Sequence, residues 1–194
     1  MKSKILITLI SVLVVIKCSS DISDPDETVK RTFLDLPAGT ALGDTTKFDN
    51  YYMIHGSYGT TIQFNRQFAG GPFGQYNISA ALFVEAGTIP ASDSLLCQLS
   101  VYVKNTCVHI FPIEQFFSHP FKLTIKYTGL DLQGINLSDL QFVLLTGSND
   151  VLDVTYDAVS IDYVTGTLEI INAVVKYDPK IDPDTKYGWV RKAE

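Results

Sequence analysis

The chain has 194 residues, of which 46% are hydrophobic, and a formal net charge of -6. This length and composition allow one domain with a sizeable hydrophobic core and disfavour a second domain. The acidic balance argues against nucleic acid as a partner, because phosphates repel an acidic surface.

The N-terminus has the layout of a secretory signal peptide. Lys2 and Lys4 precede an apolar run from Ile5 to Ile16, and the chain turns polar at Cys18. A membrane-spanning helix needs about 20 apolar residues, and this run is shorter. Residues 1–17 are therefore predicted to be a signal peptide, and the protein is predicted to be exported.

Cys18 stands where a bacterial lipoprotein carries its lipidated cysteine. The segment Val15-Ile16-Lys17-Cys18-Ser19-Ser20 resembles a lipobox followed by a polar tether, although Lys17 replaces the small residue that the signal peptidase prefers. Acyl chains on Cys18 would anchor the protein to the outer membrane or the cell surface. Without them, a soluble periplasmic or secreted protein is the alternative.

Residues 18–42 are predicted to form a lipidated or flexible tether. Their first part is polar and acidic around Pro25, and such a stretch buries too little apolar surface to order itself. From Phe33 to Leu42 the chain is more apolar, so this part could pack on the domain as an edge.

Residues 43–178 are predicted to form a single, mostly antiparallel β-sandwich of immunoglobulin type. Apolar and polar residues alternate along 95–104 and 121–127, which is typical of half-buried strands. Further short β-branched or aromatic runs are 60–64, 78–85, 108–111, 141–145, 151–156, 159–163 and 167–177. Many short strands with close turns favour a sandwich. Residues 179–194 are predicted to be a C-terminal surface extension, because prolines and charges replace the strand pattern there.

Cys97 and Cys107 are expected to be buried free thiols. A strand through Cys97 followed by a tight hairpin would place Cys107 opposite a residue near Tyr102, too far from Cys97 for a disulfide. The sequence contains no Cys-x-x-Cys or Cys/His cluster that indicates a metal, and no phosphate-binding or dinucleotide motif that indicates a cofactor.

Short motifs over about residues 80–177 resemble a ZU5-type β-sandwich domain. They are the turn from Phe83 to Ile89, the series Pro112, Phe117, Ser118, Pro120, Leu123, Ile125 and Tyr127, and the run from Val164 to Leu168. Glu85 replaces the family's turn proline, and the His-Phe-Ser signature is missing, so no self-cleavage is expected. The resemblance implies a binding or scaffolding module rather than an activity.

Aromatic residues gather between Tyr51 and Tyr76. Exposed aromatic side chains on a β-domain can stack on sugar rings or anchor a protein partner. The ligand-binding candidates in this stretch are Tyr51, Tyr52, Tyr58, Phe73 and Tyr76. In an ordinary sandwich, most of these side chains would instead face the core.

Together these patterns predict a non-catalytic, membrane-tethered binding or structural module of the cell envelope, with a protein or a glycan as ligand. A carbohydrate-binding module is one alternative. A glycoside-type hydrolase is another, because it needs only a pair of carboxylates. The glutamates of the predicted domain are Glu85, Glu114 and Glu169, and nothing in the sequence pairs them.

Overall fold

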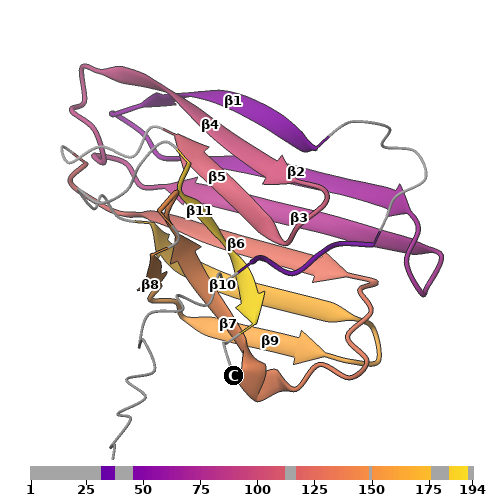
Figure 1. Cartoon of the computed structure of the whole chain (residues 1–194). Coiled ribbons are helices and arrows are strands. Elements are labelled where there is room, and N and C mark those ends of the chain that lie inside the picture. Colours follow the sequence, from indigo (N-terminus) through magenta and orange to yellow (C-terminus); the bar gives the residue numbers. More distant parts are fainter. Residues whose placement is uncertain (1–31, 38–45, 112–116, 149, 176–183, 192–194) are drawn as a thin grey trace, which may run out of the picture.

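The computed structural model describes residues 32–37, 46–111, 117–148, 150–175 and 184–191, which form two antiparallel sheets (Figure 1). Among these residues, the larger sheet has six strands in the order β1-β4-β5-β11-β7-β8, and the smaller has five in the order β2-β3-β6-β10-β9. The strands are β1 (Lys47–His55), β2 (Thr60–Ala69), β3 (Gln75–Val84), β4 (Ser94–Tyr102), β5 (Cys107–Phe111), β6 (Phe121–Thr128), β7 (Leu140–Leu145), β8 (Val151–Asp153), β9 (Ala158–Asp162), β10 (Thr167–Val175) and β11 (Lys186–Arg191). A 3-10 turn, Leu137–Asp139, precedes β7. Within the described part of the chain, no helix has the length and apolar character needed to cross a membrane.

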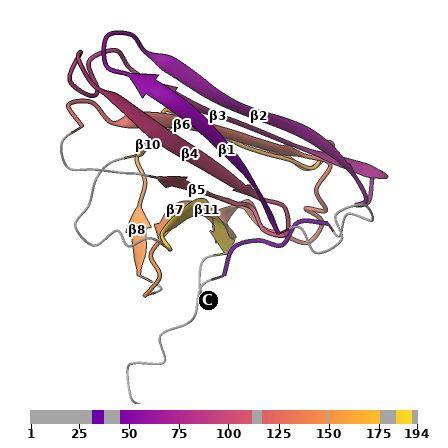
Figure 2. The same ribbon diagram turned by 90° about the horizontal axis from the view of Figure 1, so that it is seen from above.

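The two sheets pack face to face, as the view from above shows (Figure 2). Alternate residues of β2, β3 and β6 are buried between them, for example Ile78 and Leu82 on β3 and Leu123 on β6. The larger sheet contributes Leu99 and Trp189 to the same core. A sheet that is buried on one face requires this side-chain period of two. The all-β sandwich predicted from the sequence is confirmed.

The predicted strands all occur, as β2 through β10, but the sequence prediction missed β1. The core side of β1 carries Phe48, Asn50, Tyr52 and Ile54 in turn. Phe48 and Ile54 pack against the core, whereas Tyr52 is 51% exposed. The middle of this edge strand is not covered by the opposite sheet, so its core side tolerates both polar and apolar residues. This mixture hid the period-two pattern in the sequence.

The prediction of a surface extension at residues 179–194 is wrong for residues 186–191. These residues form β11, which lies between β5 and β7 in the larger sheet. Its residues from Tyr187 to Val190 are all buried. A strand covered on both faces shows no alternation of polar and apolar residues. The charged residues at its ends are typical of an exposed tail, so the sequence did not indicate a strand here. The sandwich therefore reaches Arg191 rather than ending at residue 178.

Residues 32–37, predicted to belong to the tether, pair with the larger sheet through their backbone. Isolated bridges join them to it at Phe33↔Val190 and Asp35↔Asn105. The side chain of Leu36 is 7% exposed. A free tether is therefore wrong for this segment, whereas the expectation that the chain from Phe33 packs on the domain as an edge is confirmed for residues 33–37. The remainder of the predicted tether lies outside the described residues.

Cys97 and Cys107 are buried free cysteines, as predicted. In the hairpin of β4 and β5, Val101 lies opposite Val108, so the chain turns well beyond Cys97. Burial raises the pKa of each thiol to about 12. Because the thiolate is the reactive form, these cysteines are packing residues rather than nucleophiles.

Candidate functional site

The aromatic candidates between Tyr51 and Tyr76 do not form one surface. Tyr76 is 1% exposed and stacks on Phe68, so its proposed role in ligand binding is wrong. Tyr58 and Phe73 are both more than half exposed. They lie beyond opposite ends of β2, whose 10 residues span about 30 Å. No ligand of ordinary size could contact both.

Tyr51 and Tyr52 are both exposed, but they lie on opposite sides of β1. Tyr52 shares the core side with the buried Ile54, whereas Tyr51 shares the outer side with Met53. Successive side chains of a strand point to opposite faces of its sheet. Of this pair, Tyr51 therefore belongs to the outer face of the larger sheet.

Strand pairing places large apolar side chains next to one another on this outer face, where β1, β4 and β5 lie side by side (Figure 1). Met53 lies opposite Leu96, and Tyr51 lies opposite Gln98. Gln98 in turn lies opposite Phe111. The four apolar side chains are 48% to 58% exposed. We call this surface the β1–β4–β5 face; it consists of Tyr51, Met53, Leu96 and Phe111 with the polar residues Asp49, Gln98, Ser100 and His109.

Polar side chains form the neighbouring part of the β1–β4–β5 face. Ser100 lies between Asp49 and His109 in the strand register. Gln98 Nε2 donates a hydrogen bond to Ser100 Oγ at 2.8 Å, and Lys47 forms an ion pair with Asp49 at 3.3 Å. Burial acts to raise the pKa of Asp49, but hydrogen bonds from Ser100 and Gln98 and the charge of Lys47 outweigh burial. The pKa of this carboxyl group therefore lies below its ordinary value.

His109 is the histidine of this face. Burial lowers its pKa, and the charges of Lys186 and Lys47 lower it further, so the imidazole is neutral at pH 7. Its ring stacks on Phe111 with the ring centroids 6.4 Å apart. The face thus offers an imidazole and an amide beside apolar side chains, whereas the Ser100 side chain is fully buried. Such a surface can contact a neutral ligand through both hydrogen bonds and apolar groups.

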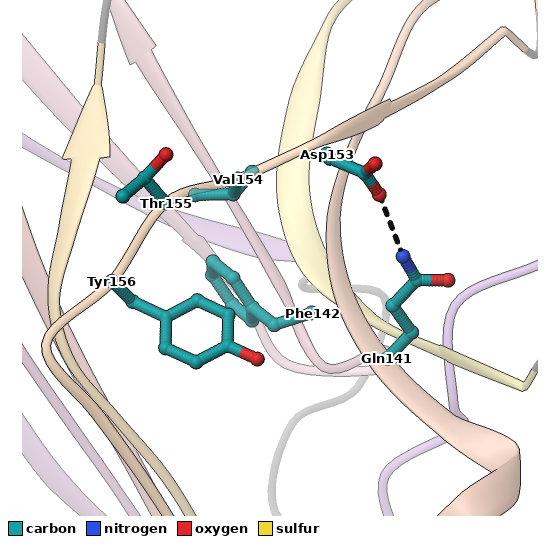
Figure 3. Close-up of a pocket in the computed structure, with 6 residues that line it drawn as sticks. All are labelled: Gln141, Phe142, Asp153, Val154, Thr155 and Tyr156. Carbon is teal, nitrogen blue, oxygen red and sulfur yellow. Dashed lines mark hydrogen bonds between the residues drawn. The ribbon is translucent and has the colours of Figure 1, made fainter.

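A depression of about 340 Å³ lies where β7 meets the link from β8 to β9. It is lined by Gln141, Phe142, Asp153, Val154, Thr155 and Tyr156. In Figure 3, the Gln141–Asp153 pair lies on one side of Phe142 and Tyr156 on the other. Gln141 Nε2 donates a hydrogen bond to Asp153 Oδ1 at 2.8 Å. One oxygen of this carboxylate is thus engaged within the protein.

Another depression, of about 330 Å³, brings Phe73 next to the outer face of the smaller sheet. Its polar lining includes Gln67 and Asn77, which lie opposite each other, and Thr128, which lies opposite Asn77. Phe73 and Val164 are the exposed apolar side chains in its lining. This depression is more polar than the β1–β4–β5 face and is separate from Tyr51.

The described glutamates do not form a catalytic pair. Glu169 forms an ion pair with Lys126 at 3.2 Å, and Lys126 lies opposite Ser79. Glu85 follows β3, six residues along the chain from Ser79, or about 20 Å away. Glycosidase carboxylates lie at most about 10 Å apart. Glu114, the remaining candidate, lies outside the described residues.

Met53, Leu96 and Phe111 belong to the candidate site but were not sequence candidates. The sequence contained a signal for Leu96. In the alternating pattern, Leu96 lies on the same side of the strand as the polar residues Gln98 and Ser100. A large apolar residue on the polar side of a strand predicts an exposed apolar contact. Leu96 lies outside the stretch rich in aromatic residues, so the prediction based on aromatic residues did not include it.

Two of the three motifs that carry the ZU5 resemblance meet at one end of the sandwich. The run from Val164 to Leu168 lies at the other end of β6, where the Gly129 N–H donates a hydrogen bond to the Thr165 carbonyl at 3.0 Å. Ser118 Oγ donates a hydrogen bond to the Gly87 carbonyl at 3.0 Å, and the Ser118 N–H donates one to the Thr88 carbonyl at 2.9 Å. Phe117 stacks on Phe121 with the ring centroids 4.9 Å apart. These contacts give the motif residues a structural role, because they link the loop after β3 to the loop before β6.

In comparisons with known proteins, no protein-family model, curated protein or solved structure matched the chain significantly. The ZU5 resemblance therefore stays a prediction. The lipid on Cys18 also stays a prediction, since that residue lies outside the described part of the chain.

Proposed function

We propose that this protein is a non-catalytic binding module of the cell envelope, exported and tethered to a membrane through a lipid on Cys18. The observation that carries the binding role is the β1–β4–β5 face, where Tyr51, Met53, Leu96 and Phe111 adjoin on neighbouring strands. Single exposed apolar residues are normal on protein surfaces, whereas adjoining ones mark interaction sites. The apolar run before Cys18 and the acidic stretch after it support the tether.

The tether is tested by the intact mass of the mature protein purified from membranes of a bacterial host. We expect a chain that begins at Cys18 and carries the added mass of its acyl chains. In a Cys18→Ala variant, that mass and the membrane association should both be lost, because the thiol is the site of attachment. An unacylated chain that begins at another residue would contradict the tether and leave an exported soluble module.

The β1–β4–β5 face also favours a carbohydrate as the ligand. Tyr51 and Phe111 flank Gln98 in one row, about 10 Å apart across two strand spacings. Aromatic rings can cover the C–H faces of sugar rings, while the amide of Gln98 can exchange hydrogen bonds with hydroxyl groups. The row is long enough for neighbouring sugar units of a neutral glycan.

This glycan role predicts that a soluble neutral glycan raises the melting temperature of the protein, because a ligand that binds only the folded state stabilises it. Thermal shifts would be measured with cello-, xylo-, laminari- and chito-oligosaccharides. Tyr51→Ala and Phe111→Ala should each weaken binding about tenfold. Tyr58→Ala is the matched control, because Tyr58 is also 58% exposed but lies off the face. Absence of a shift with every glycan, or an equal loss in the control, would contradict the carbohydrate role.

A further inference from the structure

Most of the sheet edges in the described part of the chain carry features that prevent pairing with another strand. The edges are β1 and β8 in the larger sheet and β2 and β9 in the smaller. Proteins protect such edges by short strands or by charges that point inward. β8 and β9 are three and five residues long. β2 is longer, but it carries a charge on its core side. Arg66 lies on that side between Phe64 and Phe68, and its Cζ is 4.2 Å from the centroid of the Phe48 ring.

β1 has a long and regular edge without this protection. It contains nine residues and pairs with β4 along its whole length without a register shift. From Phe48 to Ile54 its sequence has no proline, lysine or arginine. A strand of this kind offers its backbone N–H and C=O groups to another strand.

Exposed apolar side chains lie on both sides of the middle of β1. Tyr51 and Met53 are 58% and 48% exposed on the outer side, and Tyr52 is 51% exposed on the core side. A ligand on the β1–β4–β5 face would cover the first two but could not reach Tyr52. One additional strand beside β1 would cover all three.

We infer that β1 pairs antiparallel with β1 of a second copy of this chain, about a two-fold axis at Tyr52. In this register, Tyr51 lies opposite the partner's Met53, and Asp49 lies opposite the partner's His55. Apolar groups then face each other, and a carboxylate faces an imidazole, which are favourable cross-strand pairs. The pairing is isologous, so the same contacts form twice.

Neighbouring registers are less complementary. Residues directly opposite in a sheet point to the same side, so the axis must pass through a residue of β1. An axis at Tyr51 would place Asp49 opposite the partner's Met53 and Lys47 opposite the partner's His55. The first pair leaves a carboxylate beside an apolar group, and the second brings together groups that are both cationic when the imidazole is protonated. The axis at Tyr52 avoids both. An axis at Met53 would also avoid them, but it would pair only the five residues from Tyr51 to His55, because β1 ends there.

This pairing goes beyond the proposed binding function and does not depend on any ligand. It would join the larger sheets of two copies into one continuous sheet. A two-fold axis perpendicular to the sheet keeps both outer faces on the same side, so the two β1–β4–β5 faces would merge into one surface.

Disulfide trapping tests the pairing and its register. In a Cys18→Ala background, Tyr52→Cys should give a disulfide-linked dimer under mild oxidation, because opposite residues have Cα atoms about 4.5–5.5 Å apart. Asn50→Cys is the control on the same side of the same strand. In this register, its counterpart in the partner lies about 13 Å away, so it should not cross-link. The native Cys97 and Cys107 do not interfere, because both are buried. Equal cross-linking of the two variants, or none at Tyr52→Cys, would overturn the inference.

Sedimentation equilibrium separates this inference from the proposed function. Tyr52→Lys should raise the dimer dissociation constant at least tenfold, because two like charges would lie opposite each other at the axis. Leu96→Lys, on the β1–β4–β5 face but away from the edge, should leave the dimer intact. Circular dichroism would establish that both variants are folded. A wild-type protein that stays monomeric at about 100 μM, far above the dissociation constant of a typical specific dimer, would overturn the pairing without touching the binding role.

Discussion

Replacing Trp189 by alanine is expected to lower the free energy of unfolding by about 3–5 kcal/mol. Trp189 is 2% exposed on β11, in the interior of the larger sheet, and its ring meets Phe142 edge-on with the centroids 5.7 Å apart. Truncation would open a cavity of nearly a whole indole ring in the core. Guanidinium titration followed by circular dichroism measures the change.

Two further variants make this result specific to core packing. Among the described residues, the Trp189 indole N–H has no hydrogen-bond partner, so Trp189→Phe removes no bond and should cost clearly less than alanine. Val164→Ala is the surface control, because Val164 is 84% exposed in the turn before β10 and should change stability by at most about 0.5 kcal/mol. If Trp189→Ala were as mild as this control, β11 would not be a core strand.

Replacing Gly166 by alanine is expected to be the second severe change, at about 2–5 kcal/mol. Gly166 has φ of 61°, a backbone conformation that costs other residues about 1–2 kcal/mol. Its missing side chain also lets the backbone of Leu130 approach. A Cβ would contact the Leu130 carbonyl oxygen and lie 2.6 Å from its nitrogen. The Leu130 N–H donates a hydrogen bond to the Gly166 carbonyl at 3.0 Å, which holds the end of β6 to the start of β10.

Gly134 provides the matched control for this prediction. It has φ of 74°, but no atom lies within 4 Å of the position that its Cβ would take. Gly134→Ala should therefore show the cost of the backbone conformation alone, about 1–2 kcal/mol. The excess in Gly166→Ala, measured by the same denaturant titration, reports the close approach. Equal losses in the two variants would contradict the role of that contact.

Several strands that the sequence predicted, such as β3 and β6, have a buried inner face and a more accessible outer face. The alternation of 121–127, for example, became β6, with Leu123 and Ile125 in the core and Lys122 and Lys126 outside. β11 fails this rule because Phe33 packs against Gly188 on its outer side while Tyr187 and Trp189 lie in the core on its inner side. β1 fails it for the opposite reason, because the middle of its core side is left exposed.

The candidate site could be predicted only in part. Tyr51 was found as an aromatic residue in a stretch rich in such residues, but the same criterion selected Tyr76, which is buried. Composition identifies side chains able to bind a ligand and does not say which side of a strand they occupy. The position of Tyr51 beside Gln98 and Phe111 depends on the register of three strands that are distant in the chain.

The sequence by itself determined that this protein is an all-β sandwich with two buried thiols. These conclusions depend on local properties: side-chain alternation with period two, turn residues, and the spacing of cysteines along one hairpin. Only the tertiary structure decided that the C-terminal segment is an inner strand and that the apolar residues of β1, β4 and β5 adjoin. Within the part of the chain that the structure describes, it also decided that β1 is a long edge without protection. Each of these features arises from pairing between residues far apart in the chain, and a strand's own sequence does not specify its neighbour.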